Sequence, residues 1–154
     1  MSVFTASDIV EFAIRIEENG NEFYTTAADA IKDDNDIRGL LLDLAEKELV
    51  HIAIFQKLEE KFEAEKFEFN ADEVSDYISY LADQHIFGKA GAGAELANTV
   101  HTPKEALDIA FKFENDSVTF YTELEKRTES DAKKLIRQII EEEMEHAAEI
   151  KRFM

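Results

Sequence analysis

The sequence predicts an all-α protein, a bundle of four long helices made of two hairpins that a long connection joins. Three observations lead to this prediction. Helix-breaking residues are rare, with one proline and five glycines in 154 residues, while alanine, glutamate, leucine and lysine are abundant. Apolar residues recur at intervals of three and four, the period of a helix with one buried face. The two halves of the chain also repeat each other.

The first hairpin is expected over residues 5–64. Its first helix should run from about Thr5 to Ile31, with an apolar face formed by Val10, Ala13, Ile14, Gly20, Tyr24 and Ala27. Its second helix should run from about Asp36 to Ala64, with an apolar face formed by Leu41, Leu44, Ile52, Phe55 and Leu58. The polar stretch KDDND between them is the expected turn.

Residues 65–101 form the expected connection. The stretch NADE matches a helix-capping box, so a short helix is predicted from about Ala71 to Asp83. The stretch GKAGAGA that follows is typical of a flexible loop. No strand precedes it and its glycine spacing does not fit a phosphate-binding loop, which excludes a nucleotide site.

The second hairpin is expected over residues 102–153. Its first helix should run from Thr102 to about Lys126, because TPKE is a capping box with proline at the first helical position. Its second helix should run from about Ser130 to Phe153, with an apolar face formed by Ile136, Ile139, Ile140, Ala147 and Ile150.

The repeat links the two hairpins residue by residue. Four residues of the first hairpin have counterparts 97 residues later: Thr5 and Thr102, Ala13 and Ala110, Glu17 and Glu114, Tyr24 and Tyr121. A Glu-x-x-His pair recurs 95 residues later: Glu48 and His51, then Glu143 and His146. A hairpin, a long connection and a second hairpin form a four-helix bundle with one crossover. We therefore expect residues 1–154 to form a single domain.

Four glutamates lie on the apolar faces, where charged side chains are rare. They are Glu17, Glu48, Glu114 and Glu143, and a histidine follows the second and the fourth by one helical turn. The number of residues between each glutamate and its hairpin turn is similar, so all these side chains should meet near mid-bundle. Four buried carboxylates need compensation for their charge, and two divalent cations balance them, with neutral imidazoles completing the shells. Such oxygen and nitrogen ligands suit iron or manganese, with zinc as a third alternative.

Other interpretations of these residues remain open. The two histidines, His51 and His146, are alternatively core residues hydrogen-bonded to nearby acids. Tyr24 and Tyr121 each follow a predicted ligand by seven residues. They either orient ligand carboxylates and relay protons or belong to a plain aromatic core. His85 and His101 have no glutamate three residues earlier, and we interpret both as loop or surface residues, with an approach of His85 to the site as the alternative.

Composition narrows the classes of function. A net charge of −18 argues against nucleic acid and anionic membranes as partners. The absence of cysteine excludes disulfides, thiolate zinc sites and iron–sulfur clusters. No apolar run approaches a bilayer span and the acidic start does not fit a signal peptide, so a cytoplasmic location is expected. Phe62, Phe67 and Phe69 predict additional aromatic surface, which favours a homodimer.

Four segments carry a resemblance to a known family: IEENGNEFY, LAEKELVHIAIF, FENDSVTFY and IIEEEMEHAAEI. They resemble the di-iron carboxylate pattern of ferritin-like bundles, and among these the rubrerythrin-like proteins. The resemblance covers the four long helices. It implies two iron ions bridged by Glu48 and Glu143, with Glu17 and Glu114 as terminal ligands and the two histidines completing the set. It also implies that the two tyrosines hydrogen-bond to ligand carboxylates.

The chain departs from rubrerythrins in two ways. They carry a further ligand glutamate on the third helix, three residues after the first, where this chain has Ser117. The ligand exchange and peroxidase activity of the family are therefore open questions here. Full-length rubrerythrins also append a rubredoxin domain with four cysteines. This chain has no cysteine, so we expect its electrons to come from an external donor, rubredoxin-like or a flavoprotein.

The resemblance implies an oxidoreductase in which a diferrous centre reduces hydrogen peroxide or dioxygen. A ferroxidase that stores iron is the first alternative, and the acidic charge is compatible with it. Shell-forming ferritins add a fifth short helix, for which this chain has no residues after its last predicted helix. A non-catalytic metal-binding helical module is the second alternative.

Overall fold

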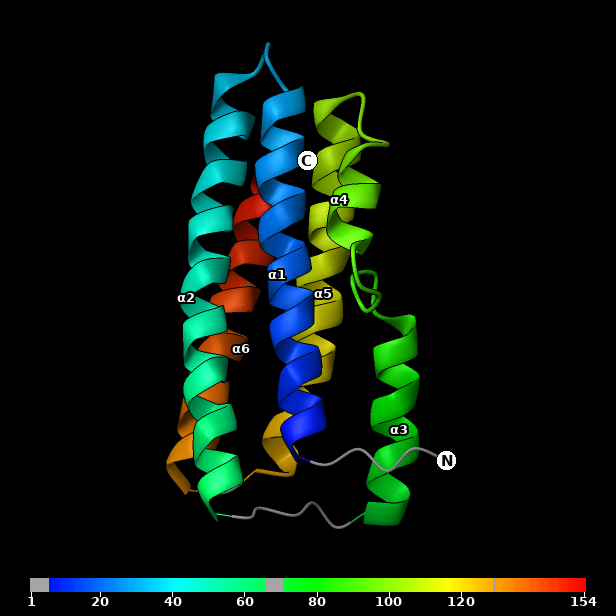
Figure 1. Cartoon of the computed structure of the whole chain (residues 1–154). Coiled ribbons are helices and arrows are strands. Elements are labelled where there is room, and N and C mark those ends of the chain that lie inside the picture. Colours follow the sequence, from blue (N-terminus) through cyan, green and yellow to red (C-terminus); the bar gives the residue numbers. More distant parts are fainter. Residues whose placement is uncertain (1–5, 66–70, 129) are drawn as a thin grey trace.

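The computed structural model describes residues 6–65, 71–128 and 130–154, and these residues are all-helical, as predicted (Figure 1). Its helices are α1 (Ala6–Ala30), α2 (Asn35–Glu65), α3 (Ala71–Gln84), α4 (Ala92–Ala97), α5 (Pro103–Lys126) and α6 (Ser130–Arg152). The four long helices form two antiparallel hairpins, α1 with α2 and α5 with α6. The turns of the two hairpins lie at opposite ends of the bundle. The ends of α1, α2, α3, α5 and α6 lie within one residue of their predictions, whereas α4 was not predicted.

The start of α5 shows how the sequence sets a helix boundary. The Oγ1 atom of Thr102 accepts a hydrogen bond from the backbone N–H of Glu105 at 3.2 Å. The Glu105 carboxylate accepts one from the backbone N–H of His101 at 3.3 Å. Pro103 has no N–H, which removes one of the donors that a helix start leaves unsatisfied. The cap predicted at Thr102 is confirmed, although Glu105 bonds the N–H of the residue before the cap and not that of Thr102 itself. The cap predicted at Asn70 lies outside the described residues.

The connection is more regular than the predicted flexible loop. That interpretation is wrong for residues 92–94, which begin α4. The buried side-chain amide of Asn19, on α1, donates to the backbone carbonyls of Phe87 and Lys89, each at 2.8 Å. Its Oδ1 atom accepts from the backbone N–H of Gly93 at 3.4 Å. A Cβ atom at Gly93 would lie 2.0 Å from the carbonyl oxygen of Asn19, so glycine lets α4 rest on α1.

The second hairpin holds the same segment from the other side. The Oδ2 atom of Asp116, on α5, accepts a hydrogen bond from the backbone N–H of Ile86 at 3.0 Å. Asn19 lies two residues after Glu17, and Asp116 lies two residues after Glu114. Equivalent positions of the repeat therefore hold one short segment of the connection against α1 and α5.

The core consists of two hydrophobic clusters, one toward each end of the bundle. Most predicted core residues are buried, but Ile14 and Ile52 are half-buried. Phe62 was predicted to be surface, which is wrong: it is 3% exposed, because the apolar face of α2 continues to this turn. Phe67 and Phe69 lie outside the described residues. No helix in the described part of the chain has the length and apolar character needed to cross a bilayer.

Candidate metal centre

A buried polar layer separates the two hydrophobic clusters at mid-bundle, and all six predicted ligands lie in it. They come from four helices: Glu17 from α1, Glu48 and His51 from α2, Glu114 from α5, and Glu143 and His146 from α6. The four carboxylates are 0% exposed, and the two imidazoles are 1% and 4% exposed. No lysine or arginine is buried among the described residues. The layer therefore holds a concentration of negative charge without a basic side chain to balance it.

The six residues divide into two groups of four that share two members. The first group is Glu17, Glu48, His51 and Glu143. The second group is Glu48, Glu114, Glu143 and His146. Within each group, the four ligand atoms lie within 4.8 Å of one another, a spacing that fits metal–ligand distances of about 2.0–2.2 Å. Glu48 and Glu143 belong to both groups, which is the position of carboxylates that bridge two ions.

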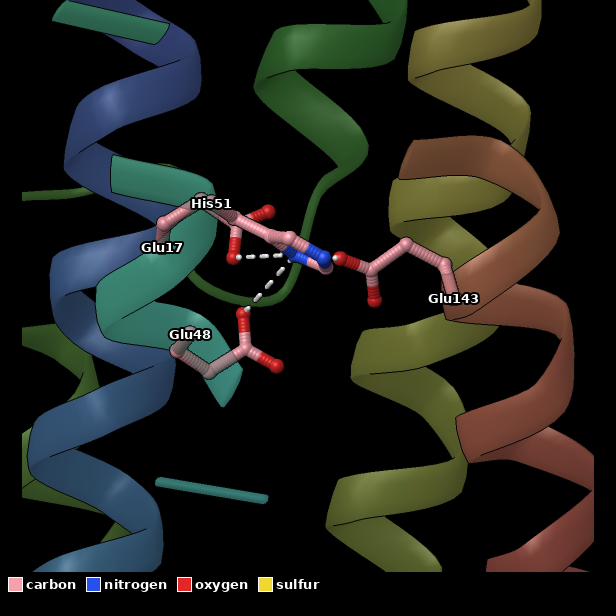
Figure 2. A group of neighbouring side chains, drawn as sticks. All are labelled: Glu17, Glu48, His51 and Glu143. Carbon is pink, nitrogen blue, oxygen red and sulfur yellow. Dashed lines mark ion pairs between the residues drawn. The ribbon is translucent and has the colours of Figure 1, made fainter. Parts of the chain in front are cut away.

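The first group surrounds the Nδ1 atom of His51. This atom lies 2.7 Å from Glu143, 3.5 Å from Glu17 and 3.9 Å from Glu48. Figure 2 shows Glu17 and Glu48 approaching the imidazole from the first hairpin and Glu143 reaching it from α6. In the second group, the Nδ1 atom of His146 lies 3.6–3.8 Å from three carboxylates. The two imidazole rings stack with centroids 5.7 Å apart, so the histidines form one side of the centre.

Unsatisfied polar atoms show that these residues fit metal ions. Each of the six residues has at least one buried nitrogen or oxygen that forms no hydrogen bond, eight atoms in total. They include both oxygens of Glu48 and of Glu143 and the Nδ1 atoms of both histidines. Buried polar atoms are normally satisfied, since an unpaired one costs about 1–3 kcal/mol. Cations held between these atoms would satisfy them.

The electrostatics of the metal-free site lead to the same conclusion. Burial, reinforced by neighbouring carboxylates, raises the pKa of Glu48, Glu114 and Glu143 above the usual range. Burial also opposes ionisation of Glu17, but the adjacent side chains of Glu48 and His51 outweigh it and lower that pKa to about 2. Burial lowers the pKa of His51, yet Glu143 and Glu17 raise it overall, to about 12. Protons thus carry the compensating charge that divalent ions carry in a loaded site.

The two predicted tyrosines contact ligand carboxylates of the opposite hairpin. The hydroxyl of Tyr24 donates to Oε1 of Glu114 at 2.5 Å, and the hydroxyl of Tyr121 donates to Oε1 of Glu17. Both rings are fully buried. Burial, together with the adjacent carboxylates, raises the pKa of both hydroxyls well above 10. They therefore keep their protons near neutral pH, which favours orientation of the carboxylates over release of a proton.

Glu142 contacts the centre, although no sequence pattern selected it as a candidate. Its Oε2 atom lies 2.7 Å from Nε2 of His51. Because an ionised carboxylate only accepts hydrogen bonds, Nε2–H is the donor, and this hydrogen bond fixes the ring orientation. The repeat places Lys47 at the equivalent position, and Lys47 instead pairs with Asp43 at 2.9 Å. Among the described residues, no carboxylate contacts Nε2 of His146, so the two halves of the centre differ.

His85 corrects the sequence interpretation. It was expected in a loop or at the surface, but it is 6% exposed because the connection folds down between α1 and α5. Its Nε2 atom lies 3.1 Å from Oγ of Ser117. Ser117 is fully buried, one helical turn after Glu114. His101 is exposed, as predicted. The apolar residues after His85, Ile86 and Phe87, were a local signal for its burial.

Comparisons with known proteins agree with this geometry. The family model described as ferritin-like domain matches residues 5–154. A crystal structure of a Thermotoga maritima protein, described as ferritin-like and diiron-carboxylate, matches with a TM-score of 0.70 and 29% identity. That match covers 99% of this chain and 95% of the other. No curated protein matches the chain.

Proposed function

Because this chain belongs to the family of ferritin-like domains, we propose that it is a di-iron oxidoreductase of rubrerythrin type. It would reduce hydrogen peroxide or dioxygen with electrons from an external donor, rubredoxin-like or a flavoprotein. We further propose that residues 1–154 form a single domain of this kind and that it acts as a cytoplasmic homodimer. The observation that carries the proposal is the pair of buried four-residue groups that share Glu48 and Glu143.

The donor set favours iron. Four carboxylates and two imidazoles supply hard oxygen and borderline nitrogen ligands, which suit iron and manganese, and the set contains no thiolate. Four carboxylate charges balance two divalent ions, so a loaded site is neutral before any oxidant binds. When bound, two ferrous ions supply the two electrons that reduce hydrogen peroxide, with two protons, to two molecules of water.

The side chains of this protein have distinct roles in the proposed reaction. Glu48 and Glu143 would hold the two ions at a fixed separation, because each belongs to both groups. Tyr24 and Tyr121 hold the carboxylates of Glu114 and Glu17 in place through buried hydrogen bonds. The clusters above and below the layer keep bulk water away, which strengthens electrostatic interactions within the centre.

The proposal is tested by loading the protein anaerobically with ferrous ion and mixing it with hydrogen peroxide or dioxygen in a stopped-flow spectrometer. We expect two ions per chain and oxidation faster than that of free ferrous ion at the same pH. Oxidation no faster than free ferrous ion would remove the proposal. Uptake of iron far beyond two ions per chain would instead support storage.

A matched pair of variants separates the site from general acidity. Glu143→Ala removes a residue of both groups, whereas Glu141→Ala removes an exposed carboxylate two residues away on the same helix. We expect Glu143→Ala to lose stoichiometric metal binding and the fast reaction. Glu141→Ala should behave like the unaltered protein. Equal losses in both variants would show that net charge, not the buried site, governs metal uptake.

A further inference from the structure

A surface cavity of about 840 Å³ lies where α1 meets the segment between α3 and α4. Figure 1 shows this segment beside α1 and α5, on the side of the bundle away from α2 and α6. Since both ligand histidines come from α2 and α6, the cavity lies on the other side of the bundle from these two helices. Arg15 and Lys89 line it together with three acidic residues. The wall is therefore mixed in charge, although the whole chain has a net charge of −18.

His85 lines this cavity and also reaches the interior. Its ring packs edge-on against Phe12 and Phe113, with centroids 6.3 Å and 5.8 Å away. The backbone N–H of Phe87 donates to Nδ1 at 3.0 Å. The hydrogen of the neutral ring is therefore on Nε2, which donates to Oγ of Ser117. Burial lowers the pKa of His85 to about 4, so the ring stays neutral and this direction holds near pH 7.

Ser117 receives this hydrogen bond but has no acceptor for its own hydrogen among the described residues. Thr119, Thr122 and Thr128 donate to the carbonyl four residues earlier in their helix or at its end. No such bond forms at Ser117, although its side chain is fully buried. Ser117 lies one turn after Glu114 on α5, and its contact with His85 places it on the side of α5 that faces the connection. Its hydroxyl is thus a buried donor beside the metal centre.

The ligand set also leaves room for a further ligand. Counting one atom from each residue, each group offers four ligand atoms, and an octahedral ion takes six. Both histidines come from α2 and α6, whereas Ser117 lies on α5.

We propose that small exogenous ligands of the metal enter through this cavity and bind on the α1–α5 side, where the Ser117 hydroxyl, held by His85, donates a hydrogen bond to them. The ligands meant are small hydrogen-bond acceptors, of which azide is the probe. The inference rests on the metal centre proposed above, but it does not depend on peroxide reduction.

The two parts of the inference affect different rate constants. The loaded, oxidised protein is mixed with azide, and the azide–ferric absorption band gives association and dissociation rates. Ser117→Ala removes one hydrogen bond from the bound state, so we expect dissociation about tenfold faster and association unchanged. His85→Phe keeps the ring packing but releases Ser117, and it should move dissociation in the same direction.

Blocking the cavity should affect only entry. Asp83 is exposed and lines the cavity, and Asp83→Trp places a large ring there. Asp76→Trp is the matched control, since Asp76 is exposed on the same helix but does not line the cavity. We expect Asp83→Trp to slow azide association and dissociation about equally, by about tenfold, so that the affinity stays the same. Asp76→Trp should change neither rate.

Each outcome supports or overturns the inference. Azide kinetics within twofold of the unaltered protein in both Ser117→Ala and Asp83→Trp would overturn it. Metal analysis of every sample comes first, because a chain that takes up no metal overturns this inference together with the proposed function. The expected azide kinetics in a protein that does not reduce peroxide or dioxygen would uphold this inference and overturn the proposed function alone.

Discussion

Replacing Glu142 by glutamine should weaken the binding of one metal ion and leave the other unchanged. Glu142 accepts a hydrogen bond from Nε2 of His51 at 2.7 Å, and His51 belongs only to the first group. A hydrogen bond to a charged group contributes about 1.5–3 kcal/mol. The Glu142 side chain is 35% exposed, so solvent screening places the effect near the lower end. We therefore expect about a tenfold rise in the dissociation constant of one ion.

The assay is a calorimetric titration of metal-free protein with manganese(II), which is stable in air and resolves successive binding steps. The control is Glu141→Gln, which removes the same charge from an adjacent position whose side chain is 68% exposed and does not contact His51. A weakening of both steps by Glu142→Gln, or an equal effect of the two variants, would refute the reasoning. The first result would mean that the halves of the centre are not independent, and the second that only net charge matters.

Three further predictions concern stability. Tyr121→Phe leaves a buried carboxylate oxygen without its donor, so the free energy of unfolding in urea should fall by about 1–3 kcal/mol. Tyr77→Phe is the control: its ring is exposed, so the free energy of unfolding should change by less than about 0.5 kcal/mol. In metal-free protein the pKa of His51 is raised from 6.5 to about 12, so its stabilising contribution is complete below pH 6.5 and is lost as pH rises toward 12. The melting temperature of chelator-treated protein should therefore fall from pH 7 to pH 10, and a rise would contradict the assignment. Gly93→Ala should destabilise the protein by about 1–3 kcal/mol, because the new Cβ would lie 2.0 Å from the backbone of Asn19. Gly39→Ala is the control: a Cβ there has no atom within 4 Å, so the same urea titration should show slight stabilisation.

Helical periodicity was sufficient to place the six ligand candidates. Glutamates are abundant in this chain, but Glu17 and Glu114 differ from most others because their neighbours one and two turns away are mainly apolar. A side chain on such a face must enter the core of a bundle. Similar distances from the hairpin turns place these glutamates at the same height along the bundle axis. The fold and the meeting of these residues at mid-bundle follow from local information.

Residues whose role depends on another helix could not be found in this way. The helix neighbours of Glu142 are mixed in polarity, so periodicity does not select it, and only its contact with His51 across the hairpins identifies its role. The burial of His85 depends on the path of the connection, which Asn19 and Asp116 determine from two distant helices. The hydrophobic period of α1 and α5 carries no information about such hydrogen bonds.

The hydrogen bonds of Asn19 and Asp116 show how a repeated pair of hairpins can recognise two different stretches of one connection. The two residues occupy equivalent positions of the repeat, yet one is an amide and the other an acid. The amide donates to two carbonyls of the connection, whereas the carboxylate accepts an N–H from it. Because a carboxylate accepts and does not donate, exchanging the two side chains would set the acid against carbonyl oxygens. A single amide-for-acid difference thus matches each hairpin to its own part of the connection.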